Sequence, residues 1–169
     1  MKKLENKVAI ITGAAAGLGK AIALLFAAEG SKVVAADINV ALLKVLEEEI
    51  TNTGGIVTTI GADMAKEEDI DELFNKAITS YGAVDILVNN AGVMDQFDPV
   101  ADVDNHTWER VMAINVTGPF KAMRKAVQLM LTAGKGAIVN IASVGGLQGA
   151  RAGAAYTTSK HALIGLTKN

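Results

Sequence analysis

Two residues near the carboxyl end of the sequence form a pair suited to acid–base chemistry. Tyr156 and Lys160 lie in a segment, Ala154 to Thr167, whose apolar spacing predicts a helix. Residues four positions apart project from one face of a helix, so the phenol and the ammonium should lie about one turn apart. A nearby cation favours the phenolate form of a tyrosine. The pair therefore fits a group that donates and accepts protons.

A serine upstream of this pair could contact a substrate. Ser143 follows the apolar run Ala137 to Ala142, at the carboxyl end of a predicted strand. In an open parallel sheet this end of the strands binds ligands, so the hydroxyl could hydrogen-bond a substrate carbonyl or alkoxide. A tyrosine and a lysine at this spacing also occur by chance on solvated helix faces, so the pair alone is weak evidence.

A glycine-rich turn near the amino terminus predicts a phosphate-binding site. The segment TGAAAGLGK, residues 12–20, lies between the β-branched run Lys7 to Thr12 and residues with helical spacing. Glycines allow a sharp turn and a close approach of backbone to a pyrophosphate, and the following helix offers free N–H groups. An ordinary loop is the alternative, which the position between strand and helix disfavours. The expected cofactor contacts in this turn are Gly13, Ala16, Gly17, Leu18 and Gly19.

An acidic residue after the second predicted strand bears on the choice of dinucleotide. Asp37 follows the run Lys32 to Ala36, where a carboxylate would reach the ribose hydroxyls of the adenosine half. It would repel a 2′-phosphate, and the next residue, Ile38, offers no cation. We therefore expect NAD(H) rather than NADP(H). The alternative is that Asp37 caps the helix that follows it.

Strands and helices must alternate to position these residues. Five apolar runs read as strands: Lys7–Thr12, Lys32–Ala36, Ile56–Ile60, Val84–Val88 and Ala137–Ala142. Helical spacing separates or follows them, at about Leu18–Phe26, Val40–Ile50, Ile70–Ile78, Asn105–Thr132 and Ala154–Thr167. This alternation predicts right-handed crossovers and an α/β fold with a parallel sheet covered on both faces.

The composition excludes several classes of protein. The 169 residues carry 16 Lys and Arg against 18 Asp and Glu, and half are apolar, as in one globular domain spanning residues 1–169. We expect no nucleic-acid partner because no basic stripe is present, and no membrane span because every apolar stretch is short. Cysteine is absent and no secretory signal is evident, so a cytoplasmic protein is expected. No metal site is expected, since His106 and His161 have no second ligand at metal spacing.

Several motifs occur together in one order along the sequence. They are Thr12-Gly13-x3-Gly17-x-Gly19, Asn89-Asn90-Ala91-Gly92, Asn115, Ser143 and Tyr156-x3-Lys160. In this combination the whole sequence resembles the NAD(P)-dependent short-chain dehydrogenase/reductase family. The resemblance implies a Rossmann-like, doubly wound parallel sheet. It also implies that the C-terminal third is lacking, with the fold truncated after the helix that follows the fifth strand.

The resemblance implies a role for each catalytic candidate. Tyr156 would be the general acid in carbonyl reduction and the base in alcohol oxidation, and Ser143 would polarise the substrate oxygen. Lys160 would assist Tyr156 and hold the hydroxyls of the nicotinamide ribose. Asn115 would position a water that links Lys160 to solvent.

The resemblance also implies further cofactor contacts. Asp63 and Met64 would contact the adenine. Four consecutive residues after the fourth predicted strand would line the adenosine side of the cofactor: Asn89, Asn90, Ala91 and Gly92. Residues 95–97, 145–148 and 151 lie where loops that face the substrate are expected.

The leading hypothesis is an NAD(H)-dependent oxidoreductase that interconverts a secondary alcohol and a ketone by hydride transfer. One alternative is a 3-oxoacyl-thioester (acyl-carrier-protein) reductase, although such reductases generally prefer NADP(H), against which Asp37 argues. The other is a catalytically inactive nucleotide-binding module or fragment. Similarity to the family also implies a homo-oligomer, paired through the helix containing Asn115 to Thr132 and through the helix that carries Tyr156.

Overall fold

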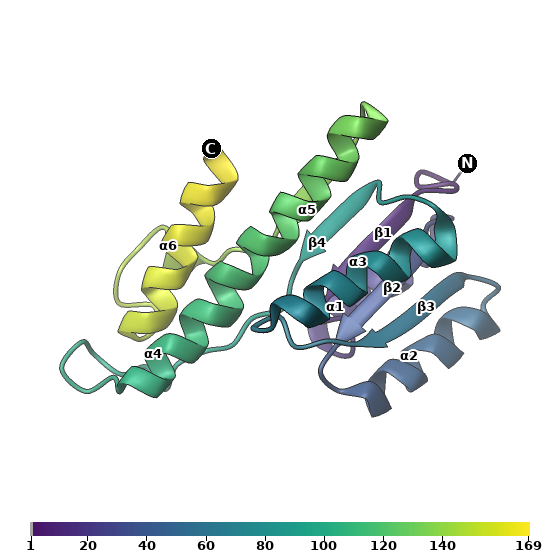
Figure 1. Ribbon diagram of the computed structural model, residues 1–169. Helices are drawn as coiled ribbons and strands as arrows, with labels where there is room; N and C mark the ends of the chain where they lie inside the picture. Colours follow the sequence, from purple (N-terminus) through teal and green to yellow (C-terminus); the bar gives the residue numbers. More distant parts are fainter. Residues whose placement is uncertain (1) are drawn as a thin grey trace.

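Five parallel strands form one sheet in residues 2–169, the part of the chain that this computed structural model describes (Figure 1). The strands are β1 (Val8–Thr12), β2 (Lys32–Asp37), β3 (Ile56–Gly61), β4 (Ile86–Asn89) and β5 (Ala137–Asn140). Their order in the sheet is β3-β2-β1-β4-β5, and each neighbouring pair is parallel. The chain therefore winds outward from β1 in both directions, which confirms the predicted doubly wound, Rossmann-like class.

Helices connect the strands as the periodicity predicts. They are α1 (Gly17–Ala28), α2 (Val40–Asn52), α3 (Glu67–Tyr81), α4 (Asn105–Met112), α5 (Gly118–Ala133) and α6 (Ala154–Lys168). The long helix predicted over 105–132 is interrupted by a π-helical turn, η1 (Ala113–Thr117). Asp104 caps the start of α4 by accepting from the Thr107 amide. The C-cap that follows α5 is Gly134, whose positive φ of 70° suits glycine.

The two faces of the sheet bury different helices. On β1, Ala9 and Ile11 point to a core shared with α1 and α2, whereas Val8 and Ile10 point to a core shared with α3 and α5. All four residues are at most 2% exposed. The alternation explains why the central strand reads as a continuous apolar run.

The last strand lies at one edge of the sheet. Ile138 packs against the α3 and α5 side, while Val139 on the opposite face is 44% exposed. Among residues 2–169, no helix combines the length and apolar character needed to cross a membrane.

The carboxyl ends of all five strands meet at one edge because the strands are parallel. The turn after β1 and the loop after β4 leave this edge in opposite directions, since β1 is followed by β2 on one side and β4 by β5 on the other. A crevice forms at such a switch point in open α/β sheets. The motif residues found in the sequence are gathered there.

Candidate active site

The turn after β1 is bonded to the loop after β4 through two polar side chains. The Thr12 hydroxyl accepts from the Asn90 and Ala91 amides at 3.1 and 3.0 Å and donates to the Val88 carbonyl at 3.3 Å. In return, the Asn90 side-chain amide donates to the carbonyls of Thr12 and Gly13 at 2.9 and 3.0 Å. The two segments that flank the switch point therefore form one bonded unit.

The backbone favours glycine at three positions of this turn. Gly13 and Gly17 have positive φ values of +64° and +54°, and a Cβ built on Gly19 would lie 2.0 Å from the Gly13 carbonyl oxygen. At the start of α1, Ala16 has no side chain that could cap the helix. The first amides of α1 therefore remain available to an anionic ligand, and Leu18 lies beside them, 55% exposed.

The Asp37 carboxylate lies at the end of β2 and is held by two backbone amides. Its Oδ2 atom accepts from the Ala15 amide at 3.0 Å and its Oδ1 atom from the Asn39 amide at 2.9 Å. The cap of α2 is Asn39, whose side chain accepts from the Leu42 amide. The alternative that Asp37 caps this helix is therefore wrong, and its position beside the glycine-rich turn needs another explanation.

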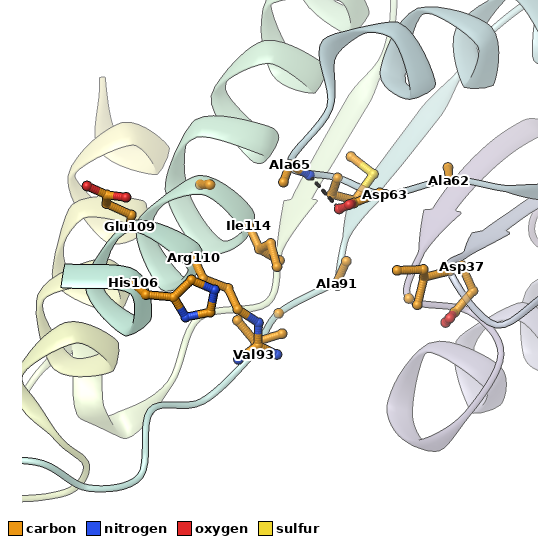
Figure 2. A pocket seen from close by; sticks show the side chains of 15 residues that line it. Asp37, Ala62, Asp63, Ala65, Ala91, Val93, His106, Glu109, Arg110 and Ile114 are labelled. Carbon is orange, nitrogen blue, oxygen red and sulfur yellow. Dashed lines mark hydrogen bonds between the residues drawn. The ribbon is translucent and has the colours of Figure 1, made fainter. Parts of the chain in front are cut away.

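A cavity of about 590 Å³ opens between these segments and α4 (Figure 2). Seven of the expected cofactor residues line it: Gly13, Asp37, Ile38, Asp63, Met64, Ala91 and Gly92. The other expected cofactor contacts in the turn and the loop do not line the cavity: Ala16, Gly17, Leu18, Gly19, Asn89 and Asn90. Of these, Asn89 is 2% exposed and bonds across the sheet to Asn140 at 2.8 Å, so its side chain supports the strands.

The far wall of the cavity comes from α4 and η1, and its lining residues were not among the predicted cofactor contacts. His106, Arg110 and Ile114 line it at intervals of four residues, and Figure 2 shows them across the cavity from Asp37. This spacing places residues on one face of a helix and is the signal that could have identified them.

The serine and the tyrosine flank the backbone of Gly145. Ser143 Oγ accepts from the Gly145 amide at 3.1 Å. A Cβ built on Gly145 would lie 3.5 Å from Ser143 Oγ and 3.7 Å from Cε1 of the Tyr156 ring. The structure thus places the Ser143 hydroxyl and the half-buried Tyr156 ring on the same glycine, and their catalytic roles stay predictions.

Lys160 is buried beside that ring. The residue is only 4% exposed. Its Nζ atom donates to the Ile141 carbonyl at 2.7 Å and lies 5.6 Å from the centre of the Tyr156 ring. Burial lowers the pKa of Lys160, because an ammonium is less stable away from water. A Cβ built on Gly92 would lie 3.6 Å from Nζ, so the lysine reaches the loop that lines the cavity.

Asn115 lies in the π-helical turn and holds the same loop. Its side chain accepts from the Val93 amide and donates to the Val93 carbonyl, both at 2.8 Å, and also donates to Ser159 Oγ at 3.1 Å. π-helical turns inside α-helices are frequent at functional sites. The side-chain amide is therefore engaged as a clamp, and its role in a water-mediated proton path stays a prediction.

Most residues of the loops expected to face a substrate are exposed, but Asp95, Gly145 and Gly146 are buried. Phe97 and Leu147 are 63% and 69% exposed. Asp95 is only 5% exposed, and its carboxylate is turned toward the start of α6.

Comparison with known proteins matches residues 7–169 to the short chain dehydrogenase family. The chain is 40% identical over 167 residues to 3β-hydroxysteroid dehydrogenase 2 of Eggerthella lenta, covering 98% of this chain and 64% of that protein. Two solved structures share its fold. An NAD+-bound xylitol dehydrogenase has a TM-score of 0.94 and 36% identity, with 99% of this chain and 64% of that one covered. A metagenomic short-chain oxidoreductase in complex with NADP has a TM-score of 0.93 and 34% identity, with 98% and 75% covered.

The chain spans 64% of the length of the hydroxysteroid dehydrogenase and of the xylitol dehydrogenase that it matches. Within that span the fold agrees with the solved structures, and the matched family is the one that the sequence resembles. On the match over residues 7–169, this chain belongs to the short chain dehydrogenase family.

Proposed function

We propose that this chain binds a nicotinamide dinucleotide and carries the groups that interconvert a secondary alcohol and a ketone. One observation carries the proposal: Ser143 and Tyr156 meet at Gly145, while Lys160 reaches from the Tyr156 ring to Gly92 on the cavity wall. Ser143, Tyr156 and Lys160 do not themselves line the cavity, so the contact of Lys160 with Gly92 is the link between the proposed proton donor and the wall that carries Gly13 and Asp37. The hydroxysteroid and xylitol dehydrogenases among the similar proteins support an alcohol or ketone substrate.

The phenol is the group that moves the proton. In ketone reduction, Tyr156 donates its proton to the carbonyl oxygen, and in the reverse direction the phenolate accepts the proton of the alcohol. Ser143 Oγ donates a hydrogen bond to the same oxygen, where negative charge develops. The nicotinamide, when bound, supplies or accepts the hydride.

Lys160 has two tasks in this proposal. Its ammonium, buried beside the ring, favours the phenolate of Tyr156 and so eases proton transfer. Its position near Gly92 also allows Nζ to hold ribose hydroxyls of the cofactor. Because burial lowers its pKa, Lys160 loses its proton at a lower pH than an exposed lysine does.

The function is tested by turnover. NADH oxidation should be observed with at least one member of a panel of cyclic and acyclic ketones that also includes a 3-oxoacyl thioester. Preference for the thioester would favour the acyl-thioester reductase instead. Tight NADH binding without turnover on the whole panel would reject the catalytic proposal and leave a nucleotide-binding module.

We expect NAD(H) to be the preferred cofactor. Asp37 faces the cavity, and Ile38 beside it is 74% exposed and offers no charge to a 2′-phosphate. The similar structures hold NAD+ in one case and NADP in another, so the preference rests on these two residues.

The double variant Asp37→Ala/Ile38→Arg should shift this preference toward NADPH. It removes the carboxylate that repels the 2′-phosphate and adds a guanidinium that can pair with it. We expect the ratio of the Kd values for NADPH and NADH to change by at least about tenfold, or roughly 1.4 kcal/mol. Fluorescence titration with both cofactors measures the ratio.

A matched control makes the same change of charge at two positions outside the cavity. In Asp102→Ala/Val100→Arg both positions are exposed, so the ratio of affinities should stay as in the wild type. An unchanged ratio in the Asp37 double variant would defeat the assignment of cofactor preference to this position.

Self-association remains part of the proposal. The outer face of α5 carries Phe120, Val127 and Leu131, which are 44%, 42% and 75% exposed. Their spacing forms an apolar stripe on the helix through which similarity to the family implies pairing with a second copy.

A further inference from the structure

The carboxylate of Asp95 caps a helix that lies far from it in sequence. Its Oδ1 atom accepts from the Gly153 amide at 3.1 Å and from the Phe97 amide at 3.3 Å, and its Oδ2 atom accepts from the Tyr156 amide at 2.8 Å. Helix α6 begins after Gly153, and no side chain at that position caps it. Asp95 therefore supplies the cap that the sequence of the helix itself lacks.

The contact between Asp95 and Gly153 is close, and a second contact ties the same loop to α6. A Cβ built on Gly153 would lie 2.5 Å from Asp95 Oδ2, so the carboxylate is seated directly against the backbone. The Ala154 amide donates to the Asp98 carbonyl at 2.9 Å, which ties a second point of the loop to α6. The first amides of a helix have no acceptor within the helix, and a negative charge there is favourable.

The loop that carries Asp95 also lines the cofactor cavity. Two residues upstream, Val93 is clamped through its amide and carbonyl by Asn115, and Gly92 and Val93 both line the cavity. Asp95 thus connects the segment expected to contact the cofactor with the turn of α6 from which the phenol projects. Lys160, one turn later, is anchored separately by the Ile141 carbonyl.

We propose that Asp95 is a positioning residue for Tyr156. It fixes the backbone of Tyr156, through its amide, relative to the loop that lines the cavity, so that the phenol reaches the substrate oxygen in the correct orientation. The proposal rests on the function above in taking this phenol as the proton donor. A residue that only stabilised the fold would not lower turnover while leaving cofactor binding unchanged.

The first test compares turnover with cofactor binding. In Asp95→Asn, one oxygen becomes an NH2 group facing backbone donors, so we expect kcat to fall about 10- to 100-fold, as misplaced catalytic groups do. The Kd for NADH should stay within about twofold of the wild type, because Asp95 does not line the cavity and Asn115 still holds Val93 there. Asp102→Asn, at an exposed position in the connection between β4 and α4, is the matched control and should change neither quantity.

The second test does not depend on activity. Amide hydrogen exchange measured by NMR should show that Gly153 and Tyr156 lose protection in Asp95→Asn, while the amide of the buried Leu163 keeps it. Gly153→Ala alters the same contact from the helix side without changing the charge, and should give the same pattern. It provides the answer if Asp95→Asn does not fold.

The outcomes separate this proposal from the function on which it rests. If the wild type reduces no ketone, the function is rejected, and the exchange at Tyr156 decides alone whether Asp95 holds its backbone. If protection is lost but kcat falls no further than in Asp102→Asn, Asp95 only stabilises the fold and the proposal is overturned. Unchanged protection overturns it as well.

Discussion

Tyr156→Phe should abolish most of the turnover and leave cofactor binding intact. The substitution removes only the phenol oxygen, while the ring can keep its place beside Gly145 and Lys160. Loss of a general acid or base typically lowers rates by about 10²- to 10⁴-fold, so kcat for ketone reduction should fall into that range. The Kd for NADH, measured by fluorescence titration, should be unchanged.

The sequence offers a matched control, since it contains two tyrosines. Tyr81 lies at the end of α3, where Lys32 Nζ is 5.9 Å from the centre of its ring. Tyr81→Phe removes the same atom outside the site and should leave kcat within the error of the assay. Turnover retained by Tyr156→Phe would show that another group donates the proton.

Gly19→Ala should have the largest effect on the phosphate-binding turn. A Cβ there would lie 2.0 Å from the Gly13 carbonyl oxygen and 2.5 Å from Asn90 Nδ2, and Asn90 is itself bonded to the turn. Because these atoms are held by backbone contacts, the turn must shift. We expect the free energy of unfolding to fall by about 1–3 kcal/mol, the usual cost of overpacking. Affinity for NADH should fall by at least about tenfold, since the displaced amides no longer face the pyrophosphate.

The control is the same substitution at a glycine with open space. Gly165 lies inside α6, and a Cβ built there meets no atom within 4 Å. Gly165→Ala should raise the free energy of unfolding by about 0.5–1 kcal/mol, because alanine favours the helix. Urea denaturation checks whether the free energy of unfolding falls in Gly19→Ala and rises in Gly165→Ala. Equal effects in the two variants would mean that the contact at Gly19 is not what matters.

The elements of the fold were largely predictable because their signals are local. The predicted strand Lys32–Ala36 and helix Val40–Ile50 differ from β2 and α2 by one or two residues. A buried parallel strand reads as a short apolar run, and an amphipathic helix repeats every 3.6 residues, so neighbouring residues suffice to recognise either. The interruption of the helix at Ala113–Thr117 was not predicted, because a single π-helical turn inside an α-helix is a local change of hydrogen-bond pattern that apolar periodicity over a long window does not resolve.

The candidate site was predictable only in part. Tyr156 and Lys160 share a helix, and their spacing alone places them near each other. The clamp that Asn115 makes on Val93 and the face of α4 opposite Asp37 depend on contacts between distant segments. Asp95 shows most clearly what the sequence does not predict. In the sequence it is one acidic residue in a loop expected to face a substrate, whereas in the structure it caps α6.

The sequence by itself determined the α/β alternation, the glycine-rich turn and the residues that mark the family, since each depends on spacing within one segment. Only the tertiary structure decided which of these side chains meet. It placed Lys160 and Asn115 next to Gly92, and Ser143 and Tyr156 next to Gly145. It also placed Asp95 at the amino-terminal end of α6. The reason is that parallel strands bring the loops after β1, β4 and β5 to one edge, and hydrogen bonds between those loops are specified by no single stretch of sequence.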